Sequence, residues 1–110
     1  MSATALAGML ACAQAASVLN DGFWLVAGSF KDPDNTNPQY AAIKQASEAV
    51  KRCGLEPFND FSVKFEKFAE GFDVVVVGAY RTEAQARVAL AKLKPCVPEP
   101  FIKAGRYLGE

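Results

Sequence analysis

The sequence predicts an α+β domain in which a four-stranded antiparallel sheet carries two helices on one face. The predicted segments follow the order β-α-β-β-α-β, and the two halves of that order are alike. The chain has 110 residues, a length that fits one domain. Hydrophobic residues make up 51% of it and charged residues 22%, as in a folded globular protein. A different α+β arrangement of the same elements is the alternative.

The first half of the domain reads as a strand followed by a helix. Residues 23–30 are aromatic and aliphatic and run into turn-forming residues, which is typical of a short strand. From Pro38 to Cys53 the apolar residues recur at helical spacing. Pro38 suits the first turn of this helix, and Gly54 suits its end.

The second half begins with two strands. Residues 55–65 alternate, with Phe61, Val63 and Phe65 on one side, and predict the first of them. Residues 72–80 contain four consecutive valines and predict the second. Valine favours extended structure because its branched side chain crowds a helix.

A second helix and a last strand complete the predicted domain. Thr82 and Gln85 have the spacing of a capping box, and apolar residues then follow on one helical face. Pro95 ends this helix. Residues 101–104 predict a short last strand, and residues 105–110 read as a tail.

The first 20 residues differ from the rest of the chain. All 12 basic and 12 acidic residues follow them, and small apolar side chains dominate them. Ala13-Gln14-Ala15 has the A-x-A spacing that a signal peptidase accepts. The stretch lacks the usual basic start, which fits a truncated leader, and it is too short and weakly hydrophobic to span a membrane.

We therefore expect a signal-peptide-like leader at residues 1–20 and an exported domain at residues 21–110, with no transmembrane span. The expected location is the periplasm or another exported compartment of the bacterial envelope. An Ala-rich first helix of the mature protein is the alternative reading of residues 1–20.

Composition excludes several classes of function. The chain has a formal net charge of zero and no histidine. Without histidine, neither a Ser–His–Asp or Cys–His nucleophile pair nor a His-containing metal site can form. The acidic residues near the middle hairpin, Asp60 and Asp73 among them, lack the spacing and shielding of a paired general acid and base. We expect no enzyme, no cofactor, no metal and, because basic residues are not in excess, no nucleic acid.

Two helices cover only one face of such a sheet. Alternation places Leu25 and Ala27 on one side of the first strand, and Trp24 and Val26 on the other. Both sides carry apolar groups, although a solvated sheet face is normally polar. We therefore expect the second face to be an open, apolar interaction surface. The alternative is that the tail or the loop of residues 31–38 folds over it.

Two segments of the chain resemble a known family. The first is Trp24-Leu-Val-Ala-Gly-Ser-Phe30, which a predicted helix follows. The second is Val74-Val-Val-Val-Gly-Ala-Tyr80-Arg-Thr-Glu-Ala-Gln-Ala86, followed by Leu90-Ala-Lys-Leu-Lys94. In order, spacing and secondary structure, these segments resemble the sporulation-related repeat (SPOR) domain over about residues 22–104.

The resemblance implies a ferredoxin-like fold that lies outside the cytoplasmic membrane of a bacterium. It implies binding of peptidoglycan, especially glycan strands stripped of their peptides, in cell division or wall remodelling. It also implies that the domain does no chemistry. The open sheet face would be the ligand surface, on which the family's pattern exposes Trp24, Val26, Phe72, Val74 and Val76.

The sequence departs from the family's pattern at two positions. The family has a Gln two residues before the Gly of the first strand, and this chain has Val26 there. Ala79 replaces the usual Pro of the later strand, whereas the Ser after the first Gly is present as Ser29. Loss of the Gln amide favours a second function, in which the same apolar face binds a wall-remodelling protein or forms a homodimer.

The chemistry of a stripped glycan strand assigns roles to the candidate residues. The C–H faces of sugars pack on aromatic rings such as those of Trp24 and Phe72. A free lactyl carboxylate requires a cation such as Arg81 or Lys103. We expect Trp24 to stack on a sugar, Ser29 to hydrogen-bond to it and Arg81 to bind the carboxylate. The full set of candidate ligand-binding residues is Trp24, Val26, Ser29, Phe72, Val74, Val76 and Arg81.

Cys53 and Cys96 would both lie in an oxidising compartment after export, where two cysteines usually pair. The predicted topology argues against that bond, because antiparallel helices place these two positions at opposite ends of the helical layer. A helix of about 16 residues is roughly 24 Å long, whereas a disulfide needs α-carbons within about 7 Å. We therefore expect both cysteines to be unpaired.

Overall fold

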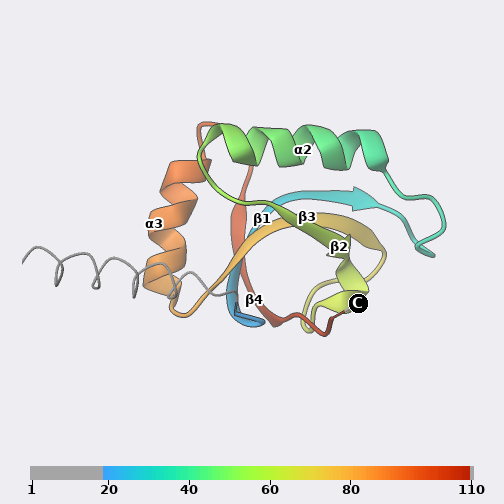
Figure 1. Ribbon diagram of the computed structural model, residues 1–110. Coiled ribbons are helices and arrows are strands. Elements are labelled where there is room, and N and C mark those ends of the chain that lie inside the picture. The colour runs from blue at the N-terminus through green and yellow to red at the C-terminus, as the bar shows by residue number, and fades with distance from the viewer. Residues whose placement is uncertain (1–18, 110) are drawn as a thin grey trace, which may run out of the picture.

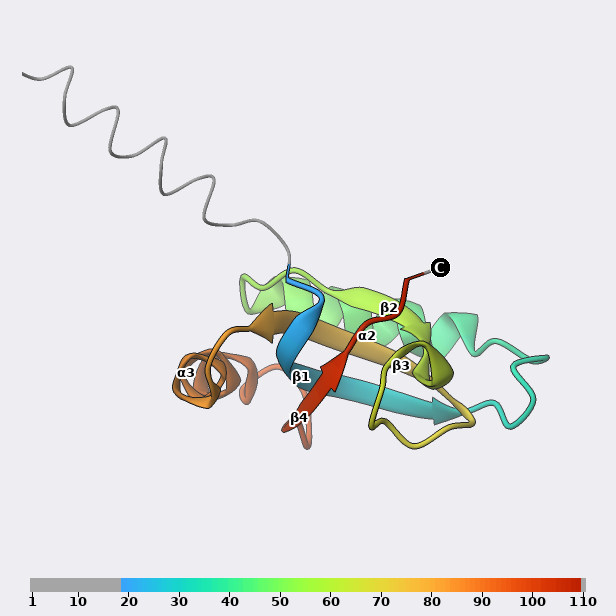
Figure 2. The same cartoon turned by 90° about the horizontal axis from the view of Figure 1, so that it is seen from below.

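The computed structural model describes residues 19–109 and arranges them as one curved sheet with two helices (Figures 1 and 2). The elements are β1 Asp21–Lys31, α2 Tyr40–Arg52, β2 Phe58–Phe61, the short 3-10 turn η1 Ser62–Lys64, β3 Phe72–Tyr80, α3 Glu83–Leu93 and β4 Phe101–Arg106. Neighbouring strands are antiparallel, in the spatial order β2-β3-β1-β4. The predicted β-α-β-β-α-β fold is confirmed. Residues 1–18 of the expected leader lie outside the described residues.

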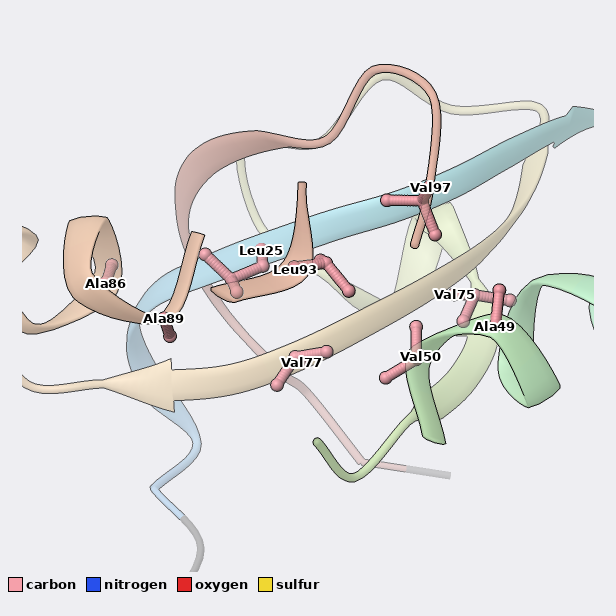
Figure 3. Packing of buried hydrophobic residues seen from close by; sticks show 9 residues of the cluster. All are labelled: Leu25, Ala49, Val50, Val75, Val77, Ala86, Ala89, Leu93 and Val97. Atoms are coloured by element: carbon pink, nitrogen blue, oxygen red, sulfur yellow. The ribbon is translucent and has the colours of Figure 1, made fainter. Parts of the chain in front are cut away.

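Both helices pack on the same face of the sheet. Leu25, Val75 and Val77 of the two central strands face them, so the predicted side of each strand is confirmed. The buried core on this face consists of Leu25, Ala49, Val50, Val75, Val77, Ala86, Ala89, Leu93 and Val97 (Figure 3).

The ends of the helices follow the predicted local signals. The hydroxyl of Thr82 accepts a hydrogen bond from the backbone N–H of Gln85 at 3.2 Å, which caps α3. The chain leaves α2 through Gly54, whose φ of +77° lies in the left-handed region that favours glycine.

The second face of the sheet is covered, so the expectation of an open face is wrong. Trp24, Val26, Val74 and Val76 are between 0% and 3% exposed on that face. Together with Phe65 they form a second core, around which further partly buried side chains pack. These surrounding residues are Phe58, Phe68, Phe72, Ala79 and Tyr107.

Part of this cover comes from the segment after β2. Only Phe58–Phe61 of the predicted strand at residues 55–65 pairs with β3, and the chain then turns through η1. The turn leaves Val63 41% exposed and buries Phe65 to 2% exposure. The predicted common side for Phe61, Val63 and Phe65 is therefore wrong, because a 3-10 turn replaces the alternation of a strand.

The rest of the cover comes from the C-terminal residues, as the alternative reading allowed. β4 extends to Arg106, two residues beyond the predicted strand. Tyr107, which was expected in a tail, forms an antiparallel bridge with Phe65. The backbone N–H of Glu66 also donates to the carbonyl of Arg106 at 2.9 Å. These contacts join the segments that follow the two edge strands, and the sheet curls around the second core (Figure 1).

Aromatic rings fill the space that the curled sheet encloses. The ring centroid of Phe65 lies 5.2 Å from that of Trp24, 4.7 Å from Phe68 and 5.0 Å from Tyr107. The indole N–H of Trp24 donates to the carbonyl oxygen of Gly105 at 3.0 Å, which satisfies its polar atom. Trp24 is therefore a core residue.

Cys53 and Cys96 form a disulfide, so the prediction of two unpaired cysteines is wrong. Their α-carbons lie 6.1 Å apart. The prediction assumed that the two helices lie side by side and antiparallel. Figures 1 and 2 instead show α3 running across the direction of α2, so that the turn after α3 reaches the end of α2.

Candidate functional site

A broad groove of about 1540 Å³ lies between α3, the end of β3 and the connection from α2 to β2. We call it the α3 groove. It is lined by Leu19, Asn20, Trp24, Gly54, Leu55, Glu56, Pro57, Phe58, Val77, Gly78, Ala79, Tyr80, Arg81, Gln85, Val88, Ala89, Lys92 and Tyr107.

Local structure fixes each wall of the α3 groove. Gln85, Val88 and Lys92 are three and four residues apart, so the capped helix α3 presents them on one face. The last residues of β3 form a second wall. The connection after α2 forms a third, and the Cys53–Cys96 disulfide ties its start to the turn that follows α3.

The lining of the α3 groove is mainly apolar, with a few polar groups at defined places. Val88 is 75% exposed and gives the groove an accessible apolar side chain. Arg81 and Lys92 supply cationic groups. Burial raises the pKa of the Tyr80 phenol above its ordinary value, so the hydroxyl stays protonated at neutral pH. An apolar surface with a few convergent polar groups is typical of a ligand site.

The seven residues predicted to bind the ligand do not form one surface in the structure. Trp24, Val26, Val74 and Val76 belong to the second core and offer a ligand almost no surface in this conformation. The dimer alternative depended on the same exposed side chains and loses its surface for the same reason. Of the other three, Ser29 is exposed, Phe72 is partly buried and Arg81 is exposed.

Ser29 and Arg81 lie at opposite ends of the central strands. Ser29 pairs with Val74, whereas Arg81 directly follows Tyr80. The two β3 positions are six residues apart, which is roughly 20 Å along a strand. One sugar ring cannot contact both, and Trp24 is the one other candidate that lines the α3 groove with Arg81.

A family model identifies what this fold is related to. The model described as the SPOR domain matches residues 19–104. The chain belongs to the SPOR domain family. SPOR domains are peptidoglycan-binding modules of bacterial cell-division proteins. No curated protein and no solved structure matches the chain.

Membership of this family indicates the general type of function. SPOR domains bind rather than catalyse, and they occur in proteins of the bacterial envelope. Within residues 19–109 neither helix has the length and hydropathy that crossing a membrane requires.

The departure of this SPOR domain at Val26 has a structural reason. Val26 is 3% exposed and shares the second core with Trp24 and Phe65. A Gln at this position would place an amide among aromatic rings, where an unpaired polar group is unfavourable. The valine is therefore consistent with the filled second face of this chain.

Sequence reasoning missed most of the polar side chains in the α3 groove of this SPOR domain, among them Tyr80, Gln85 and Lys92. The spacing of Gln85, Val88 and Lys92 was a usable signal, because it places an exposed valine between two polar residues on one helix face. Tyr80 gave no such signal. Its place in the groove depends on how α3 packs beside the end of β3.

Proposed function

We propose that this SPOR domain binds peptidoglycan glycan strands that have lost their stem peptides, that it catalyses no reaction, and that the α3 groove holds the ligand. The main support is the placement of Arg81 in a mainly apolar groove. The family supplies the ligand class, which is peptidoglycan. The groove offers an accessible surface where the sheet face does not.

The groove residues match the chemistry of a stripped glycan strand. The C–H faces of the sugars pack against Val88 and the ring of Tyr80. Gln85 offers an amide donor and acceptor for hydroxyl and acetamido groups. The lactyl carboxylate left by peptide removal pairs with Arg81, and the exposure of this cation makes the pairing sensitive to salt. We place this activity in cell division or wall remodelling.

Replacing Arg81 by Ala lowers binding to amidase-stripped sacculi by roughly tenfold, because the ligand carboxylate loses a charge-assisted hydrogen bond. The measurement is a pull-down of the whole chain over a range of sacculus concentrations. Arg87→Ala is the matched control. Arg87 is an exposed arginine on the neighbouring helix α3, paired with Glu83 at 2.9 Å, and it does not line the α3 groove.

The controls distinguish a wrong binding site from an absence of glycan binding. If Arg81→Ala and Arg87→Ala bind as well as the parent chain, the α3 groove is not the glycan site. If the parent chain is recovered equally poorly with stripped and intact sacculi, glycan binding itself is rejected. A protein partner then becomes the leading function for this envelope module.

We also propose that the chain is exported and that residues 1–20 act as its leader. The Cys53–Cys96 disulfide supports export, because structural disulfides form in oxidising compartments. Cell fractionation followed by N-terminal sequencing should recover a periplasmic or otherwise exported protein that starts between residue 16, directly after the A-x-A site, and residue 21. Recovery of the protein from the cytoplasm with residues 1–20 attached would contradict this proposal.

A further inference from the structure

Two buried carboxyl groups hold the loop between β1 and α2, residues 32–39, against the sheet. Asp32 is 1% exposed and Asp73 is 2% exposed. The backbone N–H of Asn37 donates to Oδ1 of Asp32, and that of Gln39 donates to Oδ2 of Asp73, both at 2.8 Å. Gln39 directly precedes α2 and its side chain does not cap the helix. The carboxyl group of Asp73 therefore ties the start of α2 to β3.

Each of these carboxyl groups has one oxygen left over. Oδ2 of Asp32 and Oδ1 of Asp73 accept no hydrogen bond from the protein. The two groups lie within hydrogen-bonding contact of each other. The backbone N–H of Asp32 fixes this arrangement, because it donates to the carbonyl of Gly71 at 2.9 Å, just before β3. Two ionised carboxylates in such contact would repel strongly, whereas one proton between the leftover oxygens would satisfy both atoms.

The surrounding groups do not offset a second negative charge on this pair. Asp73 lines a cavity of about 250 Å³ in which Lys64 is the basic side chain, and both ion pairs found among residues 19–109 involve other residues. Burial raises the pKa of the Asp73 carboxyl, the hydrogen bond from Gln39 lowers it, and the adjacent Asp32 raises it, with a net upward shift. The charged and titratable groups that flank the pair or share its cavity are Lys31, Asp34, Tyr40, Asp60 and Lys64.

We propose that Asp32 and Asp73 share one proton between their leftover oxygens, and that loss of this proton as the pH rises releases the loop of residues 32–39 from β3. With both groups ionised, repulsion separates the loop from the strand, and the bond that crosses between them, from Gln39 to Asp73, is the one that breaks. Asp73 is near the start of β3, whereas the α3 groove lies at the end of that strand. The pair therefore works independently of the proposed glycan binding.

The direction of the pH effect follows from the raised pKa of Asp73. The folded chain holds this proton more tightly than the unfolded chain, so the proton stabilises the folded state. That stabilisation is complete below the ordinary pKa of 3.8 and is lost as the pH rises through the raised value. The chain has no histidine, and the pKa of Tyr80 lies above its ordinary value of 10.0. Near neutral pH, the pair is thus the main source of pH-dependent stability among the side chains of residues 19–109.

The test compares the Tm of the whole chain with that of Asp32→Asn between pH 4 and pH 8. In the variant, the amide oxygen can still accept from Asn37, and the amide N–H₂ donates to Asp73 at every pH. The two proteins should melt alike at pH 4, and at pH 8 the variant should melt roughly 5 °C higher. At pH 8 the backbone N–H of Gln39 should also exchange with solvent roughly tenfold faster in the parent chain than in the variant.

Two further variants complete the experiment. Asp73→Asn also places a permanent donor between the two groups, so it should reproduce the gain at pH 8 if Asp32→Asn does not fold. Asp34→Asn removes an exposed acid of the same loop and should follow the parent chain at every pH. If the Tm difference between the parent chain and both pair variants does not change with pH, no proton is shared. A widening difference in Tm with unchanged exchange at Gln39 would show that the loop stays on β3 and would overturn the release.

Discussion

Replacing Phe65 by Ala lowers the free energy of unfolding by about 3–5 kcal/mol, the usual loss for a buried phenylalanine. Phe65 is 2% exposed and its ring packs against Trp24, Phe68 and Tyr107. Removing the ring leaves a cavity at the centre of the second core. Urea unfolding, followed by tryptophan fluorescence of the neighbouring Trp24, measures the loss.

Val63→Ala is the matched control for this variant. Val63 lies two residues earlier in the same segment and is 41% exposed, so its truncation should change the free energy of unfolding by no more than about 0.5 kcal/mol. Equal, small effects of both substitutions would mean that the segment does not cover the sheet. The open face predicted from the sequence would then be correct.

Removal of the Cys53–Cys96 disulfide lowers the free energy of unfolding by about 4 kcal/mol. The two cysteines are 43 positions apart in the sequence, and the bond restricts this long loop in the unfolded chain. The bond also ties the end of α2 to the turn after α3, so its loss should loosen a wall of the α3 groove. Urea unfolding with and without reductant measures the change.

The double variant Cys53→Ser with Cys96→Ser is the control for reagent effects. Its stability should match that of the reduced parent chain and should not respond to reductant. Mass spectrometry of the unreduced and reduced parent chain reports the bond directly. If reduction changes neither the mass nor the stability, the cysteines are free and the crossing of the two helices is wrong.

The topology was predictable because its signals are local. The valines of residues 72–80 favour a strand, and the Thr82 cap and Gly54 mark helix ends. Alternation also assigned Leu25 to the helical side of the sheet correctly. Each of these features depends on residues within one element, so the amino-acid pattern carries them.

The cover over the second face was not predictable in the same way. Phe65 and Tyr107 are 42 positions apart in the sequence, and no local sequence pattern predicts the β-bridge between them. An apolar residue such as Trp24 gives the same signal in a binding surface as in a second core. The angle between α2 and α3 is likewise set by tertiary packing. Because this angle was not predictable from the sequence, the Cys53–Cys96 disulfide was not predicted either.

The candidate site was predictable only in part. Arg81 was named from the sequence because the lactyl carboxylate of the implied ligand requires a cation, and the structure places it in the lining of the α3 groove. Gln85 and Lys92 were missed, since the groove they line forms only where α3 lies beside the end of β3 and the connection from α2 to β2.

The bridge between Phe65 and Tyr107 has a consequence for how this domain behaves at high protein concentration. A free sheet edge exposes unpaired N–H and C=O groups and can recruit strands of other chains into aggregates. Here the segments beyond the edge strands hydrogen-bond to each other, with Glu66 donating to Arg106 and Leu108 donating to Lys64. These backbone groups are thereby withdrawn from strand addition, and the short β2 leaves little further edge to extend.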